Sequence, residues 1–354
     1  MRDSLMQAYL PLIVWAGLGM LLGQFAPPRL PQLLGRLLYW VGIPLEIFAL
    51  ARQTDFAQDT GLAPLYTVIA LALGLGLALI GLAAVRWSVS SRHSGIEPAG
   101  NAAVLSLVPQ HDFDQSKDKD QPWTDPLTFT WADRPRHGSF VLASMMSNTG
   151  FVGLAIVPTL VSGPYLGWIV FYSVTQNLVG TYGFGVFLAS WFGRNTHAQS
   201  RWQLLRDMVT VPSLWAFGLG YTSRRWESLP EIEQALHQSV WLVIPLALVL
   251  MGLRLSQLQG WSSLKLAIVP TVIKVLILPA TLGAIAWRAG LPHNAVLVLV
   301  LMSGMPSAFA GLILAEEYGL DRELSAASIA LSTGALLLTI PLWLLVFGIE
   351  RVGG

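Results

Sequence analysis

The sequence predicts an all-α membrane protein whose ten transmembrane helices form two inverted five-helix repeats. Three observations lead to this prediction: an apolar composition, ten apolar segments of bilayer length, and two short sequence motifs that each occur twice. The chain has 354 residues, of which 54% are hydrophobic and only 12% are charged. Soluble domains carry about 25% charged residues, so most of this surface is expected to face lipid or other helices.

Ten segments are long and apolar enough to cross a bilayer as helices. A hydrocarbon core of about 30 Å needs about 20 apolar residues in helical form. Helix is expected because backbone groups in lipid must be satisfied within their own segment. The predicted spans cover residues 6–25, 33–51, 64–86, 139–161, 165–191, 207–222, 235–252, 264–288, 292–315 and 325–347.

The stretch between the third and fourth spans differs from the rest in composition. Residues 87–137 are polar, charged and rich in proline, which predicts a loop without a packed core. Its alternating acidic residues imitate the start of a calcium loop. However, Lys117 stands where glycine is required and Trp123 where the bidentate glutamate belongs, so we expect no metal site there.

Two repeated sequence motifs indicate an internal duplication. WVGIPL at 40–45 recurs as WLVIPL at 241–246, and FVGL at 151–154 recurs as FAGL at 309–312. We place the first repeat at residues 1–191, with the loop 87–137 as an insertion, and the second at 192–354. Because each repeat has five spans, an odd number, the two copies are expected to have opposite orientations in the membrane.

Basic residues predict the orientation of the chain. With an external N-terminus, the internal connections hold more lysine and arginine than the external ones. We therefore expect a multi-pass protein of the cell membrane, plasma or inner, with its N-terminus outside.

The fourth and ninth spans contain residues that interrupt helices. In the ninth, Pro306 moves Met305 out of helical geometry, and Gly304 relaxes the backbone beside it. In the fourth, the interrupting residues are small or hydrogen-bonding: Asn148, Thr149, Gly150 and Gly153. Broken helices leave unpaired N–H groups and a positive half-dipole, which suit an anion. Close helix packing through small residues is the alternative.

Polar side chains occur inside three other spans. Gln176 and Asn177 are adjacent amides in span five, which either contact substrate or form a helix–helix hydrogen bond. Lys274 in span eight is a candidate counter-charge for an organic anion, and Glu46 in span two a candidate proton site. The alternatives are an ion pair between Glu46 and Lys274, or a Lys274 side chain that extends to the interface.

Pro44 and Pro245 occupy the same position in the two copies of the first repeated motif, WVGIPL and WLVIPL. Each lacks an N–H and crowds the carbonyl four residues earlier, so each predicts a kink in its helix. The symmetric placement favours a role in a scaffold that both repeats build.

Several function classes are excluded or disfavoured. The absence of cysteine excludes disulfides, thiolate metal sites and a cysteine nucleophile, and a net charge of +1 gives no indication of nucleic-acid binding. Neither a His-Glu-x-x-His nor a Gly-x-Ser-x-Gly motif occurs, so an enzyme is not expected. No cofactor or metal is predicted, and coupling to protons or sodium is left open.

Three segments resemble the auxin efflux carrier family of plant and bacterial permeases. Residues 147–154 (SNTGFVGL) are similar to its fourth-span signature, residues 305–319 to its ninth span, and residues 332–342 to its tenth. Plant members place proline at the positions of Ser147 and Ala155, so a less sharp break is expected in this fourth span.

The resemblance implies a fold and a mechanism. Spans 1, 2, 6 and 7 would form a scaffold, and spans 3–5 and 8–10 a moving transport domain with broken helices four and nine crossing at mid-membrane. Such carriers move small organic anions, including auxin and dicarboxylates, by an elevator-type movement. The family's site residues fall on Asn148, Thr149, Asn177 and Pro306.

Together these features predict a secondary transporter of a small organic anion, either a carboxylate or an auxin-like weak acid. The expected hydrogen-bond donors are Asn148, Asn177 and Ser307. The lipid bilayer is the other partner, and a homodimer through the scaffold helices is a further hypothesis. Two alternatives stay open: a membrane sensor that recruits a partner through the loop 87–137, and an ion channel.

Overall fold

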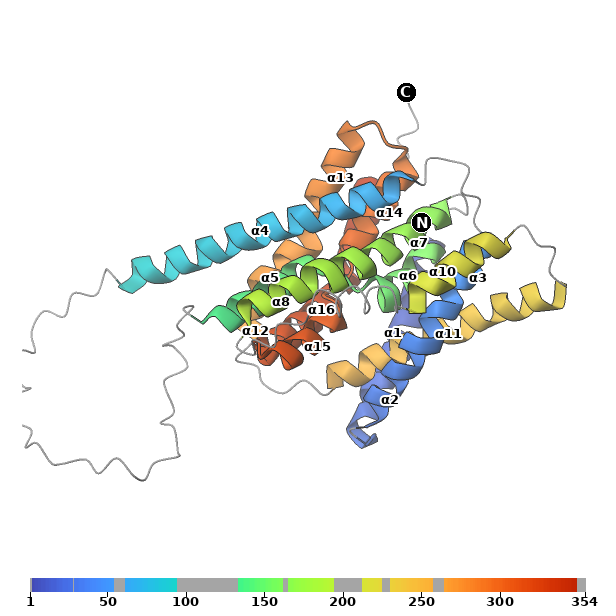
Figure 1. Ribbon diagram of the computed structural model, residues 1–354, viewed down its shortest axis with the longest axis horizontal. Helices are drawn as coiled ribbons and strands as arrows, with labels where there is room; N and C mark the ends of the chain where they lie inside the picture. Colours follow the sequence, from blue (N-terminus) through green and yellow to red (C-terminus); the bar gives the residue numbers. More distant parts are fainter. Residues whose placement is uncertain are drawn as a thin grey trace, which may run out of the picture.

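A computed structural model describes residues 2–27, 29–53, 61–93, 133–161, 165–193, 212–224, 230–256 and 264–348 (Figure 1). Every element within these ranges is helical, apart from one isolated backbone bridge. The α-helices are α1 (Arg2–Phe25), α2 (Leu30–Leu37), α3 (Ile43–Gln53), α4 (Leu62–His93), α5 (Arg134–Met145), α6 (Leu154–Ile156), α7 (Leu166–Thr175), α8 (Val186–Phe192), α10 (Pro212–Ser223), α11 (Pro230–Ser256), α12 (Leu264–Val272), α13 (Leu278–Arg288), α14 (His293–Ser303), α15 (Phe309–Tyr318) and α16 (Arg322–Phe347).

Short stretches of other helix types join several of these α-helices end to end. Four are π-helical, η1 (Leu38–Gly42), η2 (Thr149–Gly153), η5 (Gln176–Gly185) and η6 (Ile273–Ile277), and one is a 3₁₀ turn, η3 (Val157–Thr159). π-Helical turns are rare and frequently occur at functional sites. The apolar spans are therefore helical over much of their predicted length, but several are not regular α-helices.

Length and composition support a membrane protein. Four helical stretches in the described ranges are long and apolar enough to cross a membrane: Leu30–Arg52, Leu62–Trp87, Leu264–Arg288 and Arg322–Phe347. Shorter apolar helices include Thr149–Thr159 and His293–Ser303. The helical chain is interrupted just before the first of these and just after the second.

The prediction of a loop over residues 87–137 assigned helical residues to the loop at both of its ends. Helix α4 continues to His93, and α5 begins at Arg134. The remainder of the loop, residues 94–132, lies outside the described residues. A 32-residue helix is about 48 Å long at 1.5 Å per residue, so α4 exceeds what a bilayer core requires. In Figure 1, α4 extends well past the other helices.

The two symmetric prolines have different local effects. Pro44 lies in α3, directly after the π-helical stretch η1, so the helix widens just where the proline cannot donate to its ladder. Pro245 lies inside α11, which runs from Pro230 to Ser256 without interruption. The first proline thus adjoins a change of helix type, whereas the second lies within one continuous helix.

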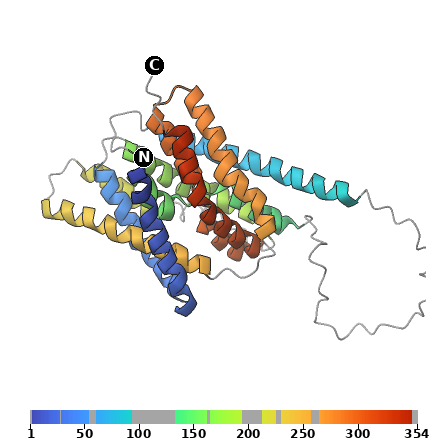
Figure 2. The ribbon, with the colours of Figure 1, turned by 180° about the vertical axis from the view of Figure 1, so that it is seen from behind.

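The helices pack in two groups, which Figures 1 and 2 show from opposite sides. In the first group α1 packs along α11, α10 packs along α3, and α11 also contacts α2 and α3. Gly19 and Gly252 allow the first of these contacts, because a Cβ added at Gly19 would lie 2.9 Å from Gly252 Cα.

The second group consists of α4, α5, α7, α8 and α12–α16. Helix α14 lies inside it, and every residue from Ala295 to Ser303 is buried. A helix that is apolar on all sides is expected to be enclosed in this way. Contacts recur in matching pairs: α4 with α5 and α13 with α14, then α5 with α16 and α14 with α7.

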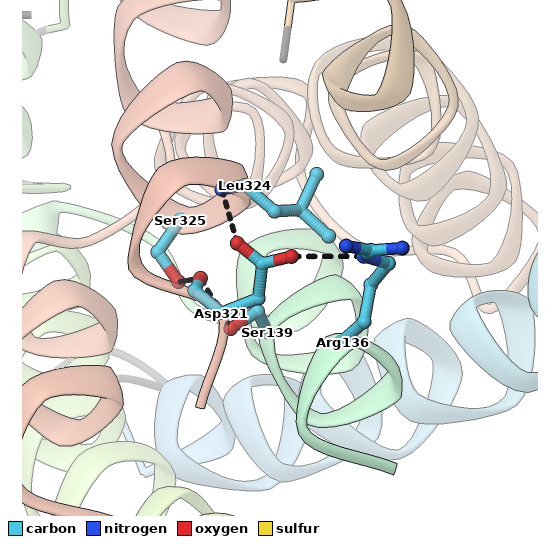
Figure 3. Close-up of polar contacts among 5 residues, drawn as sticks. All are labelled: Arg136, Ser139, Asp321, Leu324 and Ser325. Atoms are coloured by element: carbon cyan, nitrogen blue, oxygen red, sulfur yellow. Dashed lines mark hydrogen bonds and ion pairs between the residues drawn. The ribbon is translucent and has the colours of Figure 1, made fainter. Parts of the chain in front are cut away.

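Asp321 connects the beginnings of α5 and α16 (Figure 3). One carboxylate oxygen accepts from the Leu324 N–H at 2.9 Å and caps α16, while the other accepts from Arg136 Nε at 2.9 Å. The Asp321 carbonyl also accepts from the Ser139 hydroxyl at 2.7 Å. One residue therefore caps a helix and holds a second helix against it.

Candidate functional site

The first interruption separates α5 from η2. Helix α5 ends at Met145, and Met146 is extended, with φ −85° and ψ 124°. Asn148 stands outside the helical region at φ −78° and ψ 67°, and a helix resumes at Thr149. The Asn148 carboxamide oxygen accepts the Phe151 N–H at 3.3 Å, so this side chain caps the new helix.

The second interruption separates α14 from α15. Helix α14 ends at Ser303, Gly304 follows at φ −82° and ψ 0°, and Ala308 is extended before α15 begins at Phe309. Pro306 explains why the helix does not continue, because a proline disfavours helical geometry at the residue before it, here Met305. Met305 and Ser307 are buried on either side of it.

The two interruptions meet. Ser147 and Ser307 form an antiparallel backbone bridge. On one side of it the Asn148 N–H donates to the Pro306 carbonyl at 2.8 Å, and on the other the Ala308 N–H donates to the Met146 carbonyl at 3.0 Å. We call this region, residues 146–149 and 304–308, the crossing.

Several N–H groups at the crossing already have protein acceptors. Besides Asn148 and Ala308, the Ser307 N–H donates to Ser332 Oγ at 3.0 Å. The Ser307 hydroxyl donates to the Ala143 carbonyl at 2.7 Å. The expectation that both breaks expose unpaired amides is therefore wrong for these three residues: the N–H groups of Asn148 and Ala308 are satisfied by the opposite break, and that of Ser307 by α16.

Lys274 lies at the crossing as well. Its side chain, in the π-helical stretch η6, is fully buried at 0% exposure. Its Nζ donates to the Ser147 hydroxyl at 2.5 Å and to the Ser303 carbonyl at 2.6 Å. The lysine therefore does not extend to an interface. It also forms no pair with Glu46, whose buried carboxyl oxygen Oε1 has no hydrogen-bond partner in the described part of the chain.

Some buried polar atoms near the crossing have no partner among the described residues. They are Thr149 Oγ1 in η2, Ser173 Oγ in α7 and Gln176 Nε2 in η5. Both Thr149 and Gln176 are only 1% exposed. A buried polar atom without a hydrogen bond is costly, so each of these atoms is a candidate for a polar partner. Thr149 belongs to the crossing itself, whereas Gln176 Nε2 and a Leu71 methyl lie about Gly180, 2.9 and 3.0 Å from a Cβ built there.

Asn177 and Gly150 lie at the edge of this group. Asn177 Nδ2 donates to the Ser173 carbonyl at 3.0 Å, which is a bond within span five, and no bond from Asn177 to another helix is found among the described residues. A Cβ added at Gly150 would lie 3.5 Å from Asn177 Nδ2 and 3.4 Å from Ile43 Cδ1. Gly150, directly after the crossing, therefore lies between Asn177 of η5 and Ile43 of α3, a helix of the first group.

Two further contacts join the broken helices. The rings of Phe151 and Phe309 meet edge to face, with centroids 6.4 Å apart. A Cβ at Gly153 would lie 3.1 Å from Met302 Sδ, so this glycine allows η2 to approach α14 closely. Gly304 is similarly enclosed, with Trp343 Nε1 at 3.4 Å from such a Cβ.

Sequence reasoning missed several residues that build the crossing. The Ser303 carbonyl accepts from Lys274, and the Ser332 hydroxyl accepts from the Ser307 N–H. Neither serine belongs to a distinctive sequence motif. In the sequence Ser147 differs from plant carriers, which have proline there, but the sequence does not indicate that its hydroxyl accepts from Lys274. Serines inside apolar spans at the interruptions were the available signal.

Comparisons with known proteins agree with a transport function. Residues 232–344 match a family model described as membrane transport protein. An uncharacterized transporter of Methanothermobacter thermautotrophicus is 27% identical over 224 residues, which cover 61% of this chain and 72% of the relative. An uncharacterized transporter of Methanocaldococcus jannaschii is 28% identical over 214 residues, which cover 58% and 67%.

The apolar helices and these matches define a class: the chain is a multi-pass membrane transporter. The names of the matched proteins describe transport and no catalysis. More particularly, the matches confirm the resemblance to the auxin efflux carrier family that the motifs of spans four, nine and ten indicated.

Proposed function

We propose that this protein is a secondary transporter that moves a small organic anion across the cell membrane by elevator-type alternating access. The observation that carries this proposal is the crossing, where two interrupted helices bond to each other and the buried Thr149 hydroxyl has no partner among the described residues. A carrier needs such a place, because its ligand must be bound and released without a permanently open path.

The chemistry of the crossing favours an anion. Helices begin at Thr149 and at Phe309, and the N-terminus of a helix attracts negative charge. Lys274 adds a positive charge, and its hydrogen bonds go to a hydroxyl and a carbonyl, with no carboxylate among its described partners. A carboxylate ligand would supply the missing counter-charge and accept from the unpartnered donors.

We assign substrate contacts to residues around this point. Thr149 and Gln176 supply unpartnered polar atoms, and Asn148 and Asn177 present amides that can change partners when substrate arrives. Gly150, Met305, Pro306 and Ser307 shape the backbone, with Gly153 and Gly304 allowing close approach. Lys274 acts through its charge, since two of its three donors are used by protein groups.

The architecture we propose is two inverted repeats, 1–191 and 192–354. The recurring helix pairs support it: α1 with α11 mirrors α10 with α3, and α4 with α5 mirrors α13 with α14. The first group of helices would then be the scaffold, containing Pro44 and Pro245, and the second the transport domain. An external N-terminus and a homodimer through the scaffold complete the proposal.

Uptake into proteoliposomes tests the function. Wild-type protein should accumulate at least one carboxylate from a panel of radiolabelled mono- and dicarboxylates, measured at two pH values with and without sodium. Asn148→Ala and Pro306→Ala should lower this uptake at least about tenfold while the protein still inserts. Asn294→Ala and Pro292→Ala, at the other end of α14, are the matched controls. Uptake that is unchanged in both site variants would remove these residues from the site.

A further inference from the structure

Lys274 holds both interruptions at a single point. Its two acceptors belong to different breaks: Ser147 follows α5, and Ser303 is the last residue of α14. The Ser147 hydroxyl also donates to the Ser303 carbonyl at 3.3 Å, which closes a triangle of three polar groups. All three residues are buried.

The Ser303 carbonyl is at the negative end of a helix. The last carbonyls of a helix lack intrahelical partners and carry the negative half of the helix dipole. Gly304 and the extended residues after it turn the chain away, so the helix cannot satisfy this carbonyl by continuing. This carbonyl needs a hydrogen-bond donor, and the negative half-dipole favours one that is positively charged.

The lysine side chain is a donor of this kind. An ammonium group is a compact point charge with three donors, comparable in its demands to a small cation held by hydroxyl and carbonyl oxygens. Among the described residues no group of three or more acidic or histidine side chains could hold a metal instead. Trp343 Nε1, which donates to the Val275 carbonyl at 3.1 Å, fixes the π-helical turn that carries Lys274.

We propose that Lys274 is a built-in cation that completes the crossing, in the position between Ser147 and Ser303 that a bound sodium ion could otherwise occupy. Lys274 is thus a positioning residue: it holds the broken helices in the geometry that receives the anion, and the crossing assembles without sodium. This inference rests on the proposed function for its biological meaning, but its geometry can be tested without any substrate.

Thermal unfolding of the purified protein in detergent tests the proposal. The Tm of the wild type should be the same in sodium chloride, potassium chloride and choline chloride at equal ionic strength. Lys274→Ala should lower the Tm, and methylammonium or ethylammonium should restore it by several degrees, because each can enter the space left by the side chain and bind only the folded state. Tetramethylammonium, which has no donor, should not.

Two variants serve as controls. Lys274→Met fills the same space without a charge, so small amines should not raise its Tm. Lys265→Ala removes an exposed lysine from α12 and should respond to amines as the wild type does. If Lys274→Ala can be purified only when ethylammonium is present throughout, that result also supports the proposal.

Two results would overturn the inference. The first is a wild-type Tm that rises in sodium relative to choline, which would mean that the crossing binds sodium in spite of Lys274. The second is a Lys274→Ala protein that is as stable as the wild type or that no amine stabilises. Because no substrate is present, a failure to transport carboxylates would leave these outcomes unaffected and would count only against the proposed function.

Discussion

The rings of Phe151 and Phe309 lie edge to face across the crossing, with their centroids 6.4 Å apart and their planes inclined by 75°. These two residues begin the repeated motifs FVGL and FAGL, which are far apart in the sequence. The two motifs therefore contact each other through their first residues, near the start of the helix that follows each interruption.

The Phe151–Phe309 contact should be measurable as a coupling energy. In a double-mutant cycle of Phe151→Ala and Phe309→Ala, we expect a coupling of about 0.5–1.5 kcal/mol, typical of an edge-to-face pair. Thermal unfolding in detergent gives the values. The exposed pair Phe187 and Trp191 on α8 serves for comparison. Strictly additive effects would show that the rings contribute no energy to each other.

Ser332 should matter more for stability than its small size suggests. Ser332→Ala removes the acceptor of the Ser307 N–H, and a buried donor left without a partner costs about 1–3 kcal/mol. Ser144→Ala is the matched control, since its hydroxyl is also buried but donates only within its own helix, to Phe140. Equal losses of Tm in the two variants would contradict this role for Ser332.

Asp321 should stabilise α16 through both its cap and its ion pair. Asp321→Ala removes the two interactions and is expected to cost about 2 kcal/mol, whereas Asp321→Asn keeps a capping oxygen and should cost less. The measurement is again the Tm. Glu316→Ala breaks the more exposed ion pair with Arg322 and should change little. An Asn variant as damaged as the Ala variant would mean that the cap adds nothing.

The two helix groups should move relative to each other during transport. Phe171 in α7 and Phe217 in α10 pack with ring centroids 5.0 Å apart, one on each side of the boundary between the groups. The chain has no cysteine, so Phe171→Cys with Phe217→Cys can be cross-linked by a short thiol reagent without interference. Cross-linking should stop uptake, and reduction should restore it.

A pair within one helix is the control for cross-linking. Phe217 and Tyr221 stack on α10, so joining cysteines at these positions cannot restrain one group against the other. Uptake that continues at its full rate in the cross-linked Phe171/Phe217 variant would contradict an elevator-type movement.

Much of the fold could be predicted from local sequence patterns. Apolar runs gave the membrane segments, and Pro306 and Gly304 marked the end of α14, because a proline prevents its predecessor from adopting helical geometry. The extent of α4 beyond Trp87 was missed, since polar residues at the end of a long helix have the composition of a loop.

The partners of each residue could not be predicted in the same way. The bridge between Ser147 and Ser307 and the bonds of Lys274 join segments that are far apart in the chain, and periodicity describes only neighbours within one helix. A buried lysine is compatible with an ion pair, a substrate contact or a helix end. Only the three-dimensional arrangement shows that Lys274 binds the end of α14.

The most direct test of the central claim is equilibrium binding of a panel of small carboxylates to purified wild-type protein and to Thr149→Val. This variant removes a buried hydroxyl that has no partner among the described residues and keeps the shape of the side chain. We predict normal stability and an affinity for the bound carboxylate at least about tenfold weaker, which is about 1.4 kcal/mol. Thr67→Val, whose hydroxyl donates to the Ala63 carbonyl, should bind as the wild type does. Equal affinity in Thr149→Val and the wild type, or no binding of any carboxylate, would contradict an anion site at the crossing.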